Sequence, residues 1–222
     1  MFRFNLWNYV SSNLFSSPEN QINLLISEIE KMSKIGKHNN ILDVGGGLVD
    51  RGNHMVKLGK RTVVDIVDGP NVDVVADAHK LPFNKNTFEI ITSFMVLEHL
   101  YNPILAIEEC KRVLKPNGLL ALTTVQYWHS HGHPHDYYRY TREGLIYLCK
   151  NAGLKVIKIW SVGGPALVIF HAIECNLPGL LRKIFLLFCP IFNYADLIIY
   201  NHGLRKGCRD SVGWAVIAQN KE

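Results

Sequence analysis

Three consecutive glycines and the acids around them are the residues of this chain best suited to holding a ligand. Asp43 lies in the apolar run 41–44, which ends directly in the glycine run 45–47. Because glycine has no Cβ, a glycine turn after a strand lets the backbone approach a ligand closely. Asp65 follows the next apolar run, at a spacing where an acid can accept hydrogen bonds from a ribose diol. This spacing predicts a nucleotide-type site.

The acids beside the glycine run favour a cationic ligand over a phosphate. Asp43 precedes the run, and Asp50 stands where a dinucleotide-binding motif would have its third glycine. Carboxylates repel a pyrophosphate but attract an ammonium or sulfonium group. S-adenosylmethionine carries both of these cationic groups. Asp50 is also placed to cap a helix that we expect to end near Leu58.

Four motifs resemble those of class I S-adenosylmethionine-dependent methyltransferases, in the small-molecule branch with a type 11 domain. They are Leu-Asp-Val-Gly-Gly-Gly at 42–47, Asp-Ala at 77–78 with Leu-Pro-Phe at 81–83, Val-Leu-Glu-His at 96–99, and Arg-Val-Leu-Lys-Pro-Asn-Gly at 112–118. In the last motif Asn117 replaces the family's first glycine. The resemblance implies a Rossmann-like, doubly wound α/β fold with a seven-stranded sheet. That sheet is mostly parallel with an antiparallel last strand, and helices cover both faces.

The same resemblance implies S-adenosylmethionine as the cofactor. It assigns cofactor contacts to Asp43, Gly45, Gly46, Gly47, Asp65, Asp77, Ala78 and Phe94. The glycines accommodate the methionine part, and Asp43 orders its ammonium directly or through water. Asp65 binds the ribose, and Asp77 accepts a hydrogen bond from the adenine amine while Ala78 leaves room for the ring. Phe94 lines the methionine side.

Strands and helices alternate along the chain as such a fold requires. Apolar runs predict strands at 41–44, 62–64, 72–76, 88–94, 119–125, 154–160 and 211–219. Caps and helical periodicity predict helices at 18–32, 103–114 and 142–151, and residues 115–118 are expected to form a turn. We treat the chain as one methyltransferase domain with an N-terminal arm and helix (1–36), a cofactor-binding core (37–161), an apolar insertion (162–210) and a last strand (211–222).

A loop rich in histidine and tyrosine follows the fifth expected strand, at the sheet edge where ligands bind. Its alternating histidines are His129, His131, His133 and His135. Three interpretations are open: a metal site, a solvated loop held by aromatic side chains, and a lid that faces the substrate. We favour the lid, because Gly132 and Pro134 break any regular presentation of the imidazoles and no cysteine is nearby.

The lid interpretation supplies a catalytic pair and substrate contacts. His135 is expected to take the proton from an attacking hydroxyl, with Asp136 holding the imidazole tautomer. Tyr137 and Tyr138 offer flat faces to a substrate, and Arg139 suits an acidic or phosphorylated one. The stretch 133–141 is similar to a motif of methyltransferases associated with polysaccharide or glycolipid synthesis.

Glu98 and His99 raise a second question about metal binding. Adjacent Glu and His ligate a divalent ion in some ubiquinone-pathway O-methyltransferases, but those relatives carry an acid three residues before the Glu. This chain has Met95 there. We therefore expect no metal, and we expect Glu98 and His99 to orient the loop above the cofactor, with His99 also in the substrate site.

About 50 residues, 162–210, stand where the fold usually has a short hairpin. The apolar runs 165–173 and 184–192 are too short to span a bilayer, and Pro178 and Pro190 interrupt this region. One interpretation is helices in a membrane interface with basic residues toward anionic headgroups. The other is a cap on the core or a dimer face.

Composition narrows the function classes. The chain has 222 residues, of which 48% are hydrophobic and 19% charged, as expected for one α/β domain with additions. The net charge of +5 comes without a dense basic run, so we expect no nucleic-acid partner. The five scattered cysteines lack CxxC spacing and indicate reduced thiols in the cytoplasm. The N-terminus is expected to be an unprocessed arm.

The predicted function is methyl transfer from S-adenosylmethionine to a hydroxyl of a small molecule, or of a sugar in a polysaccharide or glycolipid precursor. The expected location is cytoplasmic, at the inner face of the membrane if the insertion binds lipid. Two alternatives stay open. One is methylation of the head of a quinone or another lipid, and the other is a non-catalytic, cofactor-binding regulatory subunit.

Overall fold

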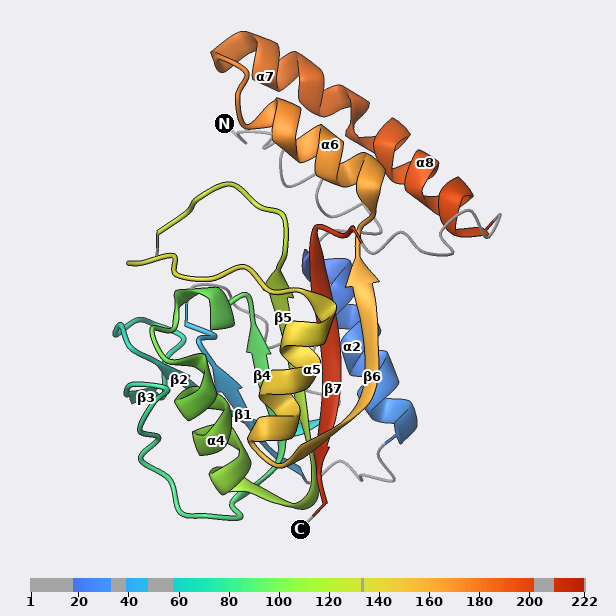
Figure 1. Ribbon diagram of the computed structural model, residues 1–222. Helices are drawn as coiled ribbons and strands as arrows, with labels where there is room; N and C mark the ends of the chain where they lie inside the picture. The colour runs from blue at the N-terminus through green and yellow to red at the C-terminus, as the bar shows by residue number, and fades with distance from the viewer. Residues whose placement is uncertain (1–17, 33–38, 48–57, 133, 202–209, 222) are drawn as a thin grey trace.

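A seven-stranded sheet forms the centre of the computed structural model, which describes residues 18–32, 39–47, 58–132, 134–201 and 210–221 (Figure 1). The strands are Asn39–Val44 (β1), Gly59–Asp65 (β2), Val74–Val75 (β3), Phe88–Phe94 (β4), Leu114–Val125 (β5), Leu154–Val162 (β6) and Gly213–Asn220 (β7). Their order across the sheet is β3-β2-β1-β4-β5-β7-β6. The first five strands are parallel, and β7 runs antiparallel to both of its neighbours. The predicted fold class is confirmed.

Helices cover both faces of the sheet, which explains why its strands are apolar at successive positions. Helix α2 (Pro18–Met32) lies on one face, and α4 (Pro103–Val113) and α5 (Arg142–Asn151) lie on the other (Figure 1). Side chains alternate between faces along a strand. On β4, Ile90 belongs to the core that includes α2 residues, whereas Ile91 belongs to the core that includes α4 and α5 residues.

Polar caps fix where the two helices on the second face begin. The Asn102 side chain accepts a hydrogen bond from the Leu105 amide, at 3.2 Å, ahead of α4. The Thr141 hydroxyl accepts one from the Gly144 amide, at 3.1 Å, ahead of α5. Each side chain satisfies an amide that has no partner within its helix.

The stretch 115–118 is not the separate turn that the sequence predicts. The structure includes these residues in β5, where the register against β4 shifts between the Phe88–Leu114 pair and the Ile90–Leu119 pair. Asn117 takes a left-handed conformation, with φ of 64°. Asn tolerates this conformation better than most residues, so the turn residues form a bulge within a longer strand.

The insertion folds into helices beyond the carboxyl end of β6 (Figure 1). They are α6 (Pro165–Glu174), α7 (Gly179–Phe185), the 3-10 helix η2 (Leu186–Phe188) and α8 (Cys189–Asn201). A small apolar core of Leu167, Phe170, Leu186, Cys189 and Val212 lies between them and the start of the last strand segment. Among the described residues, no helix combines the length and apolar character needed to cross a membrane.

Asp196 holds α6 and α8 together. Its carboxylate accepts hydrogen bonds from the amides of Ala166, at 3.0 Å, and Leu167, at 3.1 Å, in the first turn of α6. A Cβ added at Gly164 would lie 2.4 Å from an oxygen of this carboxylate. The amides at a helix N-terminus have no partners within the helix and carry partial positive charge. Asp196, on α8, therefore provides hydrogen-bond acceptors for two amides at the N-terminus of α6.

Several predicted features lie outside the described residues. They are the N-terminal arm, the Asp50 cap with most of its helix, His133, and the basic residues of 202–209. The division of the chain into four segments stays a prediction.

Asp196→Ala is expected to destabilise the insertion by about 1–2 kcal/mol, the cost of losing a helix cap. Hydrogen exchange should become faster in the first turn of α6 but stay unchanged in β1 and β4. Asp68→Ala is the control, because Asp68 lies in an exposed turn and accepts from the amide of its neighbour Gly69. Equal exchange at α6 in both variants would contradict the capping role.

Candidate functional site

The glycine run forms a tight turn at the carboxyl ends of β1 and β2. Gly45 has φ of +72°, and its amide donates to the Val64 carbonyl at 2.8 Å. A Cβ at Gly45 would lie 2.4 Å from Val96 Cγ2, so glycine is required there. The Gly47 amide donates to Asp65 Oδ2 at 3.0 Å. The structure therefore brings the glycine turn and Asp65 together, as the sequence predicts.

Asp65 lies at the end of β2 with its carboxylate fixed at this edge. Oδ2 accepts from Gly47, and Oδ1 accepts from the Val67 amide at 3.2 Å. Asp65 is partly buried. A carboxylate held in this way retains acceptor capacity for hydroxyl donors such as those of a ribose.

Asp77, beyond β3, has a carboxylate that is oriented by His79. Asp77 Oδ1 accepts from the His79 amide at 2.9 Å and from His79 Nδ1 at 2.5 Å. His79 Nε2 accepts from the Asn102 amide at 3.2 Å, and the ring stacks on Tyr101 with centroids 4.0 Å apart. The Asp77 side chain is 43% exposed, so it can still meet a ligand.

The charge state of Asp77 follows from the same contacts. Partial burial raises the pKa of Asp77, but the hydrogen bonds from the His79 amide and ring outweigh it, and the pKa is lowered. Asp77 is therefore ionised at neutral pH, and both of its carboxylate oxygens can act as hydrogen-bond acceptors. The role of His79 in orienting Asp77 was not predicted from the sequence. The one sequence feature that could have indicated it is a histidine two residues after an aspartate. The neighbouring Ala78 packs into the core.

Asp43 lies beneath the glycine turn and is fully buried. Its Oδ2 accepts from Arg61 Nη2 at 2.6 Å and Nε at 3.1 Å, and its Oδ1 accepts from the Thr92 hydroxyl at 2.8 Å. Sequence analysis missed Arg61 as a partner. Because both oxygens of Asp43 bind protein groups, its role toward a ligand ammonium stays a prediction. The same holds for Phe94, which is 1% exposed within the core under α2.

The histidine and tyrosine loop is fastened to the segment after β4. The 3-10 helix η1 (Leu97–His99) offers the Glu98 carbonyl to the amides of Tyr137, at 2.8 Å, and Tyr138, at 3.3 Å. His99 Nδ1 donates to the His135 carbonyl at 2.6 Å. These bonds hold the loop over the carboxyl ends of β4 and β5, which is the position that the lid interpretation requires (Figure 1).

Asp136 does not pair with His135 as predicted. Its carboxylate accepts from Arg139 Nη1 at 2.5 Å and Nη2 at 2.6 Å, and from the His131 amide at 2.9 Å. The Arg139 guanidinium holds the pKa of Asp136 far below its usual range. A bidentate guanidinium is a stronger partner for a carboxylate than a neutral imidazole. Asp136 and Arg139 therefore stabilise the loop, while His135 is exposed beside Tyr137.

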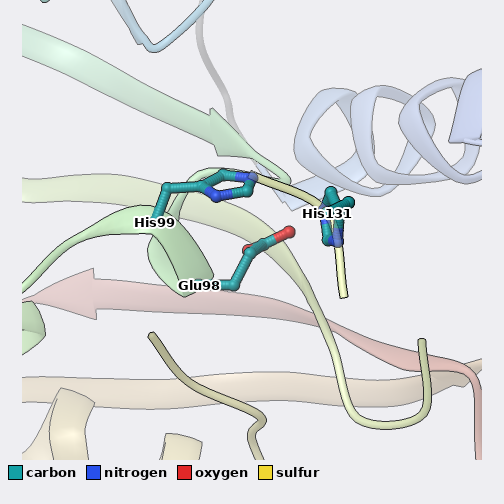
Figure 2. A group of neighbouring side chains, drawn as sticks. All are labelled: Glu98, His99 and His131. Atoms are coloured by element: carbon teal, nitrogen blue, oxygen red, sulfur yellow. The ribbon is translucent and has the colours of Figure 1, made fainter. Parts of the chain in front are cut away.

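Three side chains that could bind a metal converge beside this loop. Glu98, His99 and His131 each offer one ligand atom, and these atoms lie within 4.8 Å of one another (Figure 2). The Glu98 side chain is fully buried, and its Oε2 accepts from the Thr124 hydroxyl at 2.8 Å. Burial raises the pKa of Glu98. All three residues were considered from the sequence, but the proximity of His131 to Glu98 and His99 was not predicted.

Known proteins that resemble this chain in sequence or fold include methyltransferases. A sequence profile described as a methyltransferase domain matches residues 43–122. Residues 43–122 therefore carry a methyltransferase domain. The predicted family resemblance is confirmed, and S-adenosylmethionine is the cofactor of this family.

Individual relatives of the methyltransferase domain are distant. The ubiquinone/menaquinone biosynthesis C-methyltransferase of Pseudomonas putida is 30% identical over 112 residues, which cover 41% of this chain and 44% of that protein. The chain spans less than half the length of the curated relatives that it matches.

Two solved structures have a similar fold. Phosphoethanolamine N-methyltransferase 2 of Haemonchus contortus, in complex with S-adenosyl-L-methionine, has a TM-score of 0.61 at 18% identity, covering 97% of this chain and 56% of that one. The 1,6-didemethyltoxoflavin-N1-methyltransferase of Burkholderia thailandensis has a TM-score of 0.58 at 14% identity, covering 92% and 80%.

Arg61→Met is expected to lower the free energy of unfolding of the methyltransferase domain by about 3–5 kcal/mol, because it leaves the buried Asp43 carboxylate without its cation. The double variant Asp43→Asn, Arg61→Met should lose less, since no unpaired charge remains. Urea unfolding measures both. Arg142→Met is the control, with an exposed partner at 3.7 Å and an expected cost below about 1 kcal/mol. A double variant less stable than Arg61→Met would be the contrary result.

Proposed function

We propose that this chain transfers a methyl group from S-adenosylmethionine to a hydroxyl oxygen of a small molecule, or of a sugar in a polysaccharide or glycolipid precursor. The observation that carries the proposal is one sheet edge with two kinds of group. The glycine turn, Asp65 and Asp77 lie there, and the loop with His135, Tyr137 and Tyr138 is hydrogen-bonded to η1 at the same edge.

The residues present fit the cofactor. Asp65 would hold the ribose hydroxyls, since its oxygens face the glycine turn and accept only amide hydrogen bonds among the described residues. Asp77 would accept the adenine amine through its exposed carboxylate. The glycine turn would lie along the methionine part, where Cβ atoms would crowd the approach. When bound, S-adenosylmethionine supplies a methyl carbon whose bond to sulfur breaks as a bond to the acceptor oxygen forms.

The loop would position the acceptor and receive its proton. His135 is exposed and not engaged by Asp136, so its imidazole is available to solvent and substrate. A neutral imidazole can accept the proton of an attacking hydroxyl. Tyr137 and Tyr138 are 47% and 41% exposed and supply flat surfaces for a sugar ring. The loop would also exclude water, which favours methyl transfer to the acceptor over side reactions.

A second candidate is methylation of the head of a quinone or another lipid. It is favoured by one comparison, because the 112-residue match is to a protein named for quinone biosynthesis and C-methylation. A non-catalytic regulatory role is the third candidate. Incubation with S-adenosylmethionine carrying a labelled methyl group distinguishes them: label enters a nucleotide-sugar or glycolipid extract, a quinone extract, or neither.

Asp65→Ala and Asp77→Ala are each expected to weaken binding of S-adenosylmethionine and S-adenosylhomocysteine by about 10- to 100-fold, the value of a hydrogen bond to a charged group. Calorimetric titration measures this, with NAD as a ligand that should not bind. Glu108→Ala, on the exposed side of α4, is the control and should leave the affinity unchanged. A folded protein that binds neither ligand would overturn the proposed function.

We also propose that the insertion contacts a membrane surface, which would bring the enzyme to a lipid-linked acceptor. Exposed apolar side chains of α6–α8 are Ile169, Ile173, Leu180, Leu181, Ile184, Leu187, Phe188, Ile191, Tyr194 and Ile198. Leu180 is 72% exposed. Lys183 is exposed on the same α7 helix, as a cation near anionic headgroups would be.

Leu180→Glu together with Leu187→Glu is expected to lower binding to anionic vesicles at least about 10-fold, because two exposed apolar side chains become charged. Co-sedimentation with phosphatidylglycerol vesicles measures it. Tyr147→Glu, at an exposed position on α5, is the matched control. If the protein ignores vesicles and instead forms a dimer that the double variant disrupts, the apolar surface is a subunit interface and the membrane proposal fails.

A further inference from the structure

The cluster of Glu98, His99 and His131 contains a buried carboxylate oxygen with no hydrogen-bond partner among the described residues. Glu98 Oε2 has the Thr124 hydroxyl, but Oε1 has none. Figure 2 shows the carboxylate directed toward the space between the two imidazole rings. A buried polar atom without a partner costs about 1–3 kcal/mol, and more when it carries charge. A cation bound between these side chains would remove that cost.

We propose that Glu98, His99 and His131 bind a divalent transition-metal ion such as Zn²⁺. Two histidines and one glutamate are a known ligand set for catalytic zinc, with further positions left for water or substrate. Imidazole ligands favour transition metals over Mg²⁺ and Ca²⁺, which prefer oxygen atoms. The ligand types therefore select the class of ion.

The surrounding hydrogen bonds orient both imidazoles for coordination. Metal-binding histidines usually donate their second ring N–H to a carbonyl or carboxylate. His99 Nδ1 donates to the His135 carbonyl at 2.6 Å, and His131 Nδ1 donates to the His129 carbonyl at 3.1 Å. Each bond keeps the proton on Nδ1, so the lone pair is on Nε2. The Asp136 carboxylate, which holds the His131 amide, lies 3.6 Å from His131 Nδ1 and adds negative charge there.

The site needs a small contraction to close around an ion. Two atoms that each lie ~2.1 Å from one tetrahedral Zn²⁺ are ~3.4 Å apart, whereas the present ligand atoms lie within 4.8 Å of one another. Glu98 is fully buried in the middle of η1, while His131 belongs to the exposed loop. An inward shift of the His131 side chain by about 1–1.5 Å would close the site without moving the sheet.

The position suggests a role that rests on the proposed function. Glu98 and His99 follow β4, and His131 follows β5, so the ion would lie at the ligand-binding edge. Its open positions would take the acceptor oxygen and lower the pKa of that hydroxyl. The hydroxyl proton would pass to His135 or to solvent, the oxygen–methyl bond would form, and the methyl–sulfur bond would break. Metal binding itself does not depend on this role.

The test is titration of chelator-treated, full-length protein with Zn²⁺, and with Co²⁺ read by its visible absorption. We expect one ion per chain. Glu98→Gln and His131→Asn should each weaken Zn²⁺ binding at least about 10-fold. His129→Asn is the matched control, because it changes a histidine of the same loop whose side chain is outside the cluster. It should leave the affinity within about twofold.

Each outcome decides the proposal. No ion binding, or equal affinity in all three variants, overturns it. If Glu98→Gln does not fold, His131→Asn in the exposed loop still gives the answer. S-adenosylhomocysteine binding is measured on the same samples, so the two proposals fail separately. Cofactor binding without metal binding removes only the metal site, and metal binding without cofactor binding removes only the proposed function.

Discussion

The buried carboxylate of Asp43 is the interaction on which the cofactor end of the structure depends. Asp43 is on β1, Arg61 on β2 and Thr92 on β4, so one side chain joins three adjacent strands. A Cβ at Gly46 would lie 2.2 Å from Asp43 Oδ2, which shows that the glycine turn packs directly on this ion pair. Loss of the Arg61 partner would leave a buried, uncompensated carboxylate directly under the turn. The charge beneath the site is thus part of its architecture.

The histidine and tyrosine loop has a comparable organising element in η1. Its carbonyls receive the Tyr137 and Tyr138 amides and, through Leu97, the Tyr140 hydroxyl at 2.9 Å. Met95, just before it, has φ of 56°, a left-handed conformation that is uncommon for a non-glycine residue. This residue lies between β4 and η1, and the Glu98 side chain of η1 is fully buried. The glycine turn follows β1 and η1 follows β4, so the two elements lie at the ends of adjacent strands.

Much of the fold could be predicted from the sequence because the strands are buried on both faces. The stretch 88–94 has apolar side chains at Phe88, Ile90, Ile91 and Phe94, and β4 has the predicted bounds. Thr141 was likewise predicted as the N-cap of the helix that the structure has as α5. Residues 115–118 read as a turn because Pro, Asn and Gly dominate them, yet pairing with the neighbouring strand kept them in β5. The sequence correctly predicted that Asn117 would take a turn conformation. Pairing of the segment with β4, which the local sequence does not show, places residues 115–118 in β5.

The site was predicted in part, and the misses share a cause. Asp65 and the glycine run follow a motif with fixed spacing, so sequence alone brings them together. Arg61, His79 and His131 act through contacts whose partners depend on how strands and loops are placed. The pairing of Asp136 with His135 was wrong because adjacency in sequence is a poor guide when a guanidinium three residues away can reach the same carboxylate. Competition among partners is not visible in a linear pattern.

The insertion has its own small core and its own helix cap from Asp196. A unit stabilised by internal contacts can open and close as a cooperative segment, independently of the element to which it is attached. The hydrogen bonds described above for Asp65 and Asp77 come from residues outside α6–α8. Under the proposed function, this separation would let the choice of acceptor, or of the surface where the acceptor is met, change while the residues proposed to bind the methyl donor are kept.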